Sequence, residues 1–159
     1  MERSPDPTDE GTESRVAVAG HPIHPMMVTF PIAFLIAVLG SDLAYVLSGD
    51  PFWARASLWL AGAGTLAGAA AGAAGAVELL VVRGIRRRAA AWSHFVAAVM
   101  PLSVGFANWM LRLDDAEAAV LPWGLYLSAL GAAQVGLAGW LGGKLVFHHQ
   151  IGIVEDDGD

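Results

Sequence analysis

The sequence predicts an all-α fold, an integral membrane bundle of four helices in up-down-up-down order. Its 159 residues are 55% apolar and only 15% charged, which is too apolar a composition for an ordinary soluble domain. Four segments are long enough to cross a hydrocarbon core of about 30 Å as helices, at about 1.5 Å per residue. The alternation of apolar and polar residues that marks an amphipathic strand is absent from the sequence.

The expected spans follow one another with short connections. We expect one transmembrane domain over residues 20–154, after a disordered acidic tail at 1–19 and before a second acidic tail at 155–159. The connections between spans are four to eight residues long, which favours antiparallel neighbours. The four spans are residues 26–47, 52–82, 89–113 and 122–147.

Lysine and arginine residues indicate how the bundle is oriented. Loops that face the cytoplasm carry an excess of these residues. Seven of the nine lie on the side of the two termini and the loop at 83–88, whereas Arg55 and Arg112 lie on the other side. We therefore expect a multi-pass protein of the cell membrane, inner or plasma, with both termini in the cytoplasm.

Composition also excludes several classes of function. The net charge of −6 comes largely from the acidic tails, and the chain lacks a basic stripe, so we expect no nucleic-acid partner. The chain contains no cysteine, which excludes a thiol nucleophile and an iron–sulfur cluster bound by this chain. Histidine and carboxylate side chains remain as the groups that could bind a ligand or take part in a reaction.

Glycines at four-residue spacing indicate close contacts between helices. Gly64, Gly68 and Gly72 lie in the second span, and Gly139 and Gly143 lie in the fourth. Small residues at this spacing let helix backbones approach closely in lipid. We favour contacts within one bundle, and a homodimer through Gly64, Gly68 and Gly72 is the alternative.

Polar residues within the spans fall into two layers. Because a polar group is costly in lipid, each is expected to face the bundle interior or a cavity. In the outer layer we expect Asp42 to pair with Arg112, with Asn108 as a further hydrogen-bond partner; a ligand or quinone site is the alternative. The cytoplasmic layer holds the five histidines and one carboxylate: His21, His24, Glu78, His94, His148 and His149.

The cytoplasmic layer suggests a binding site, because histidine is the commonest metal ligand and also binds haem iron. His24, His94 and His149 lie on the inward faces of three different helices, and we expect them to be ligands. For His21 and His148 we favour hydrogen bonds to lipid headgroups or helix ends.

Two charged groups accompany these histidines. Glu78 can ligate a metal directly, orient an imidazole, or remain a protonated acid through burial. Arg86 belongs to an arginine loop that usually only sets the topology, but beside such a site it can hold haem propionates or lipid phosphates.

The motifs of this chain resemble a bacterial family of predicted four-span membrane proteins, domain of unknown function 2231. The resemblance covers roughly residues 20–154. It implies a redox setting, since some relatives are fused to Rieske or c-type haem modules. This chain has Lys144 where the family usually has an acid, and Glu78 where it usually has Asp. The matching residues are His21-Pro22-x-His24-Pro25, Phe30-Pro31, Asp42, His94, Asn108, Arg112, Gly139-Trp140-Leu141-Gly142-Gly143, Leu145-Val146 and His149.

Three hypotheses follow for the function. The first is a membrane redox component that binds haem b through His94 and either His24 or His149, with Arg86 near the propionates and redox proteins as partners. The second is a non-haem metal-binding or metal-transport protein, and the third is a structural or assembly subunit of a membrane complex. A nucleophile–base arrangement is not recognisable, which favours a protein that is not an enzyme. In the second hypothesis a Zn, Cu or Fe ion is held by His21, His24, Glu78, His94 and His149.

Overall fold

Four long helices dominate the computed structural model, which describes residues 17–18 and 21–147. All four are long and apolar enough to cross a membrane, as judged by length and composition. The predicted all-α class is confirmed, and the only addition among the described residues is a two-residue ladder in which Ala17 lies opposite Pro22. In chain order the elements are β1 (Ala17–Val18), β2 (His21–Pro22), α1 (Ile23–Met27), α2 (Thr29–Ser48), α3 (Pro51–Val81), α4 (Arg83–Arg86), α5 (Ala89–Leu111), the π-helical segment η1 (Val120–Gly124) and α6 (Leu125–Phe147).

The tight turn between α2 and α3 is encoded by three consecutive residues. Gly49 ends α2 in the left-handed region at φ 68°, and its N–H donates to the carbonyl of Tyr45; glycine adopts this conformation without a steric penalty. Asp50 then caps α3, since its Oδ1 accepts from the N–H of Phe52 at 2.9 Å. Pro51 occupies the first helical position, where its missing N–H costs nothing.

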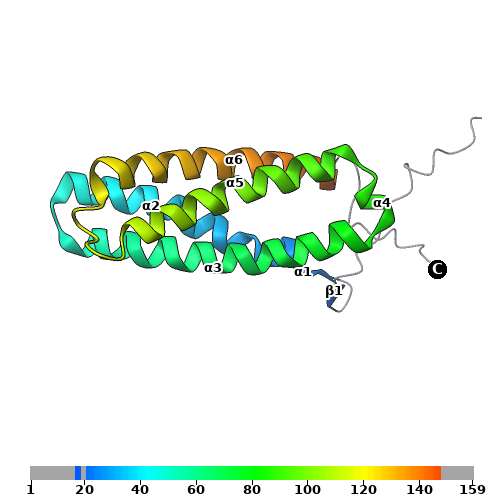
Figure 1. Cartoon of the computed structure of the whole chain (residues 1–159), viewed down its shortest axis with the longest axis horizontal. Coiled ribbons are helices and arrows are strands. Elements are labelled where there is room, and N and C mark those ends of the chain that lie inside the picture. Colours follow the sequence, from blue (N-terminus) through cyan, green and yellow to red (C-terminus); the bar gives the residue numbers. More distant parts are fainter. Residues whose placement is uncertain (1–16, 19–20, 148–159) are drawn as a thin grey trace, which may run out of the picture.

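Neighbouring long helices run in opposite directions (Figure 1). Along α2 and α3, and again along α5 and α6, the residue number rises on one helix as it falls on the other. We call the end of the bundle at α4 the α4 end, and the end where α2 turns into α3 the Asp42 end. Facing pairs are Leu35 with Gly64, Pro31 with Gly68 and His24 with Gly75, then Val104 with Gly131 and His94 with Gly142.

Small residues lie inside the bundle and large apolar side chains lie outside it. A Cβ added at Gly64 would come within 3.0 Å of Leu35, and one at Gly68 within 3.1 Å of Leu102. Trp59 and Leu66, on the same helix, are 76% and 61% exposed, as expected of side chains that face lipid tails. Two of the three glycines at four-residue spacing therefore pack within the chain, and a homodimer through them stays a prediction.

A hydrophobic cluster fixes the turn from α3 to α5 at the α4 end. Leu79, Val82, Ile85 and Ala91 are buried together there. Val82 is extended, so α3 ends one residue earlier than expected and the chain turns into α4. The cluster sets the positions of Glu78 at the end of α3 and His94 at the start of α5.

Candidate functional site

The Asp42 end contains a closed network of buried polar side chains. Asp42 and Arg112 are fully buried and form an ion pair at 2.8 Å. Both guanidinium Nη atoms donate to the carboxylate, at 2.9 and 2.8 Å, and Nε donates to Asn108 Oδ1 at 3.1 Å. The predicted Asp42–Arg112 pair, with Asn108 as its further partner, is confirmed.

Two serines complete this network, and the sequence analysis did not identify them. Ser57 of α3 donates to Asp42 Oδ1 at 2.6 Å. Ser128 of α6 lies within 2.5 Å of Asp42 Oδ2 and accepts from Asn108 Nδ2 at 2.9 Å. The carboxylate is thus shared by all four long helices, and each polar group in the network has a partner. Such a network stabilises the bundle and offers no free group for chemistry.

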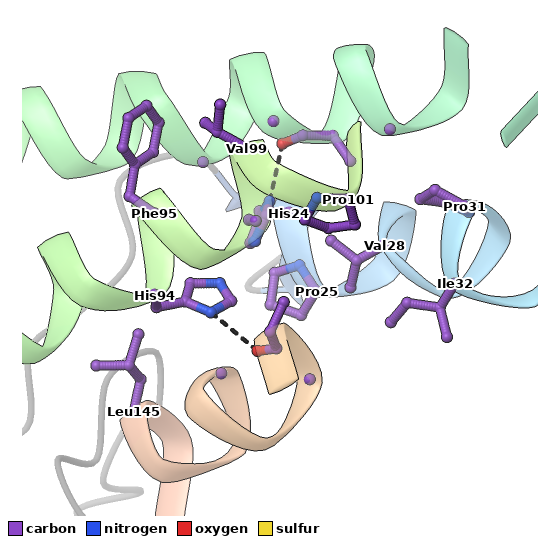
Figure 2. A pocket seen from close by; sticks show the side chains of 18 of the residues that line it. His24, Pro25, Val28, Pro31, Ile32, His94, Phe95, Val99, Pro101 and Leu145 are labelled. Atoms are coloured by element: carbon purple, nitrogen blue, oxygen red, sulfur yellow. Dashed lines mark hydrogen bonds between the residues drawn. The ribbon is translucent and has the colours of Figure 1, made fainter. Parts of the chain in front are cut away.

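His24 and His94 lie close together at the α4 end. Their ring centroids are 6.3 Å apart and the ring planes meet at 74°. His24 Nδ1 lies 2.8 Å from the carbonyl of Ala71 on α3, and His94 Nδ1 lies 3.1 Å from the carbonyl of Ala138 on α6. Figure 2 shows these two carbonyls on opposite sides of the ring pair.

These bonds determine which nitrogen of each ring is available. A carbonyl oxygen can only accept, so Nδ1 of each ring carries the proton and donates it. In the neutral ring, Nε2 then holds the lone pair. A backbone carbonyl on the other nitrogen is also the usual way in which a metal-ligating histidine is oriented. Nε2 of each ring is therefore the nitrogen that these two carbonyl bonds leave unengaged.

Glycines make room for both rings. A Cβ added at Gly75 would lie 2.9 Å from Nδ1 of His24, and one added at Gly142 would lie 3.0 Å from Cε1 of His94. Both distances are far below ordinary van der Waals contact, so any larger residue would displace the imidazole. Glycine at these two positions therefore leaves the space that each imidazole occupies.

A cavity of about 610 Å³ adjoins the two histidines, a size typical of small-molecule and cofactor sites. Its lining is apolar apart from His24, His94 and Glu78. Gly72 of α3 and Gly139 of α6 face open space within it, because a Cβ at either position would meet nothing within 4 Å. The cavity lining thus includes one glycine on each of these two helices where no side chain fills the adjoining space.

Glu78 is the one carboxylate of the cavity lining. It is only 8% exposed, and its Oε1 is buried without a hydrogen-bond partner among the described residues. A buried acceptor that lacks a partner destabilises the protein by about 1–3 kcal/mol. Such an atom in a cavity wall is free to accept a hydrogen bond from water or from a ligand in the cavity.

The structure brings together only part of the predicted ligand set. His24, Glu78 and His94 line one cavity, whereas Arg86 is exposed, does not line it, and donates to the carbonyl of Leu80 at 3.3 Å. Within the described ranges, no group of three or more histidine and acidic side chains is arranged to hold a metal ion as it stands. His148, His149 and the side chain of His21 lie outside the described residues.

Fold and site together define a four-helix membrane protein with a paired-histidine cavity at one end. The family described as "Predicted membrane protein (DUF2231)" matches residues 20–155 of the chain, and the protein belongs to that family. No curated protein and no solved structure matches it.

Proposed function

We propose that the protein is a small membrane redox component that binds haem b in the α4-end cavity, where His24 and His94 would hold the haem. The observation that carries this proposal is the 6.3 Å separation of the two ring centroids. An imidazole nitrogen lies about 1 Å from its ring centre and a metal–nitrogen bond is about 2 Å long, so two rings about 6 Å apart are close enough to hold one iron together. Two imidazoles suffice for haem, because the porphyrin supplies the other ligands.

The cavity walls support a large flat ligand over a bare ion. Gly72 and Gly139 leave open space where a macrocycle can lie, and the apolar lining excludes water from it. The carbonyls of Ala71 and Ala138 hold the rings in one tautomer and orientation. When bound, haem b would supply one-electron transfer.

The arginines near this end support the proposed orientation. Arg83 and Arg86 lie in α4 and Arg87 follows it, and such a cluster favours the cytoplasmic side. Both termini are then cytoplasmic, and redox partner proteins would dock at this face. Ile85, next to Arg86 in the chain, lines the cavity, so Arg86 would need a change of rotamer to turn its long side chain toward an anionic ligand there.

The proposal predicts a haem spectrum in the purified protein. After expression in haem-replete cells, the full chain in detergent should show a Soret band and sharp bands after dithionite reduction, with near-equal amounts of haem and protein. Absorption spectroscopy with metal analysis measures this. A protein that carries no porphyrin under these conditions overturns the proposal.

One observation favours a second candidate, a non-haem metal site. Glu78 Oε1 is buried without a partner among the described residues, and a carboxylate beside two imidazoles is a common ligand set for zinc and iron. The ion would be Zn, Cu or Fe, and Glu78 would move toward the two rings to complete the site.

Replacing Glu78 separates the two candidates. For a non-haem site, Glu78→Gln should lower metal content by about tenfold or more, because an amide is a much weaker ligand than a carboxylate. For the haem site, the same change should leave haem content within about twofold, because Glu78 is not an axial ligand. Metal analysis and haem quantitation on the same preparation measure both, and unchanged metal content would exclude Glu78 as a ligand.

A further inference from the structure

The two halves of the chain repeat the same residues at the same spacing. On the first helix of each half, residues recur after 70 positions, and on the second helix they recur after 67. The two offsets differ because His94 and Gly142 are 48 positions apart, three fewer than the 51 positions between His24 and Gly75. Seven pairs of positions correspond, and all but Asp42 with Arg112 hold identical residues: His24 with His94, Pro31 with Pro101 and Asp42 with Arg112, then Gly64 with Gly131, Ala71 with Ala138, Gly72 with Gly139 and Gly75 with Gly142.

The repeated residues also make the same contacts. His24 donates to the carbonyl of Ala71 and packs on the glycine four residues later, and His94 does the same with Ala138 and Gly142. Duplication of one hairpin would explain why the two imidazoles share this arrangement. The hairpin of α2 and α3, with α1 before it, and the hairpin of α5 and α6 are therefore two copies of one structural unit.

The packing of the helices places a pseudo-two-fold axis between these copies. The first helix of each unit contacts the second helix of the other, α2 against α6 and α5 against α3, as an isologous arrangement requires. Corresponding residues meet each other at both ends of the bundle: His24 faces His94, and Asp42 pairs with Arg112. The axis therefore runs along the bundle, as in parallel repeats whose axis follows the membrane normal.

The cavity lies on this axis. Of the seven repeated pairs, the five at the α4 end all line it, and Figure 2 shows Pro31 and Pro101 together with the two histidines around the same space. The charged lining residue breaks the symmetry, since the position that corresponds to Glu78 is occupied by Leu145. The two imidazoles, by contrast, have matching surroundings.

We infer that the chain is a duplicated helical hairpin whose ligand lies on the pseudo-two-fold axis, so that His24 and His94 are equivalent ligands of one group. Gly75 and Gly142 are then equivalent positioning residues. This inference rests on the proposed function for the identity of the ligand, but the equivalence of the two rings follows from the repeat.

Matched single substitutions test this equivalence. His24→Ala and His94→Ala should each weaken haem binding by at least about tenfold, which is the lower range for losing even an outer-shell partner of a metal ligand. The haem that remains should show the same change in both variants, from a low-spin to a high-spin spectrum, and added imidazole should restore the low-spin form in both. Thermal unfolding of each variant checks that the fold is kept.

The outcomes distinguish this inference from the proposed function. If either variant keeps the spectrum and haem content of the unsubstituted protein, the equivalence is overturned while haem binding stands. If the unsubstituted protein binds no haem, the proposed function fails, and the same variants are then titrated with Zn²⁺ alone, followed by thermal shift. Equal loss of Zn²⁺ stabilisation in both supports equivalent ligands, whereas unequal loss, or no stabilisation of the unsubstituted protein, overturns the inference.

Discussion

Arg112→Leu is expected to lower the free energy of unfolding by about 3–5 kcal/mol, because it leaves the Asp42 carboxylate buried and without its counter-charge. Both side chains have no exposed surface. The guanidinium supplies two of the hydrogen bonds to the carboxylate, and leucine can supply none. Unfolding of the purified protein in mixed detergent and SDS, followed by circular dichroism, measures the change.

The position of the network explains why the effect is large. Asp42 accepts from α3 through Ser57 and lies against α6 through Ser128, in addition to its pair with α5. A charge that loses its partner here cannot reach water without separating helices.

Two further variants make this prediction specific. Arg55→Leu removes an exposed arginine near the same end of the bundle, and it should change stability by less than about 0.5 kcal/mol, as surface substitutions usually do. Asp42→Leu combined with Arg112→Leu should recover part of the loss, because no isolated charge remains. If the double variant is as unstable as the sum of the two single variants, the ion pair is not the cause.

The Asp42 end was largely predictable from the sequence, because charges are so rare within the spans. Asp42 and Arg112 each stand alone in an apolar helix, and helical stepping puts Asn108 on the face of Arg112. Ser57 and Ser128 were not predicted, because the hydroxyl of a serine in a membrane helix can donate to a backbone carbonyl of its own helix. A serine therefore does not indicate which face of the helix is buried. Their roles depend on which helices become neighbours.

The α4 end was predictable only in part. Helical stepping predicted that His24, His94 and Glu78 lie on inward faces at the same depth. In the structure all three line one cavity. Neither the Nδ1 bonds nor the space at Gly75 and Gly142 could be read from helical stepping, since both depend on a partner helix. The sequence signal for these contacts was the repeat, in which residues recur after 70 positions on the first helices and after 67 on the second. A search at a single period does not detect it, because the two offsets differ.

Gly142→Leu is expected to lower haem content by at least about tenfold while the helices remain folded. A Cβ at this position would lie 3.0 Å from the ring of His94, so the imidazole must rotate away and its bond to the Ala138 carbonyl is lost. Outer-shell bonds of this kind are worth about 10–100-fold in metal affinity. Helix packing can survive, because the rest of the leucine side chain can enter the cavity.

The matched control is Gly136→Leu on the same helix. This glycine is exposed, and a Cβ there meets nothing within 4 Å, so the two variants share the gain in helix propensity and differ only in what the new side chain meets. Haem content should stay within about twofold for Gly136→Leu. The repeat adds a stricter requirement, since Gly75→Leu displaces His24 in the same way and should match Gly142→Leu in haem loss. Equal haem content in Gly142→Leu and Gly136→Leu would mean that the space at Gly142 does not position His94 for binding.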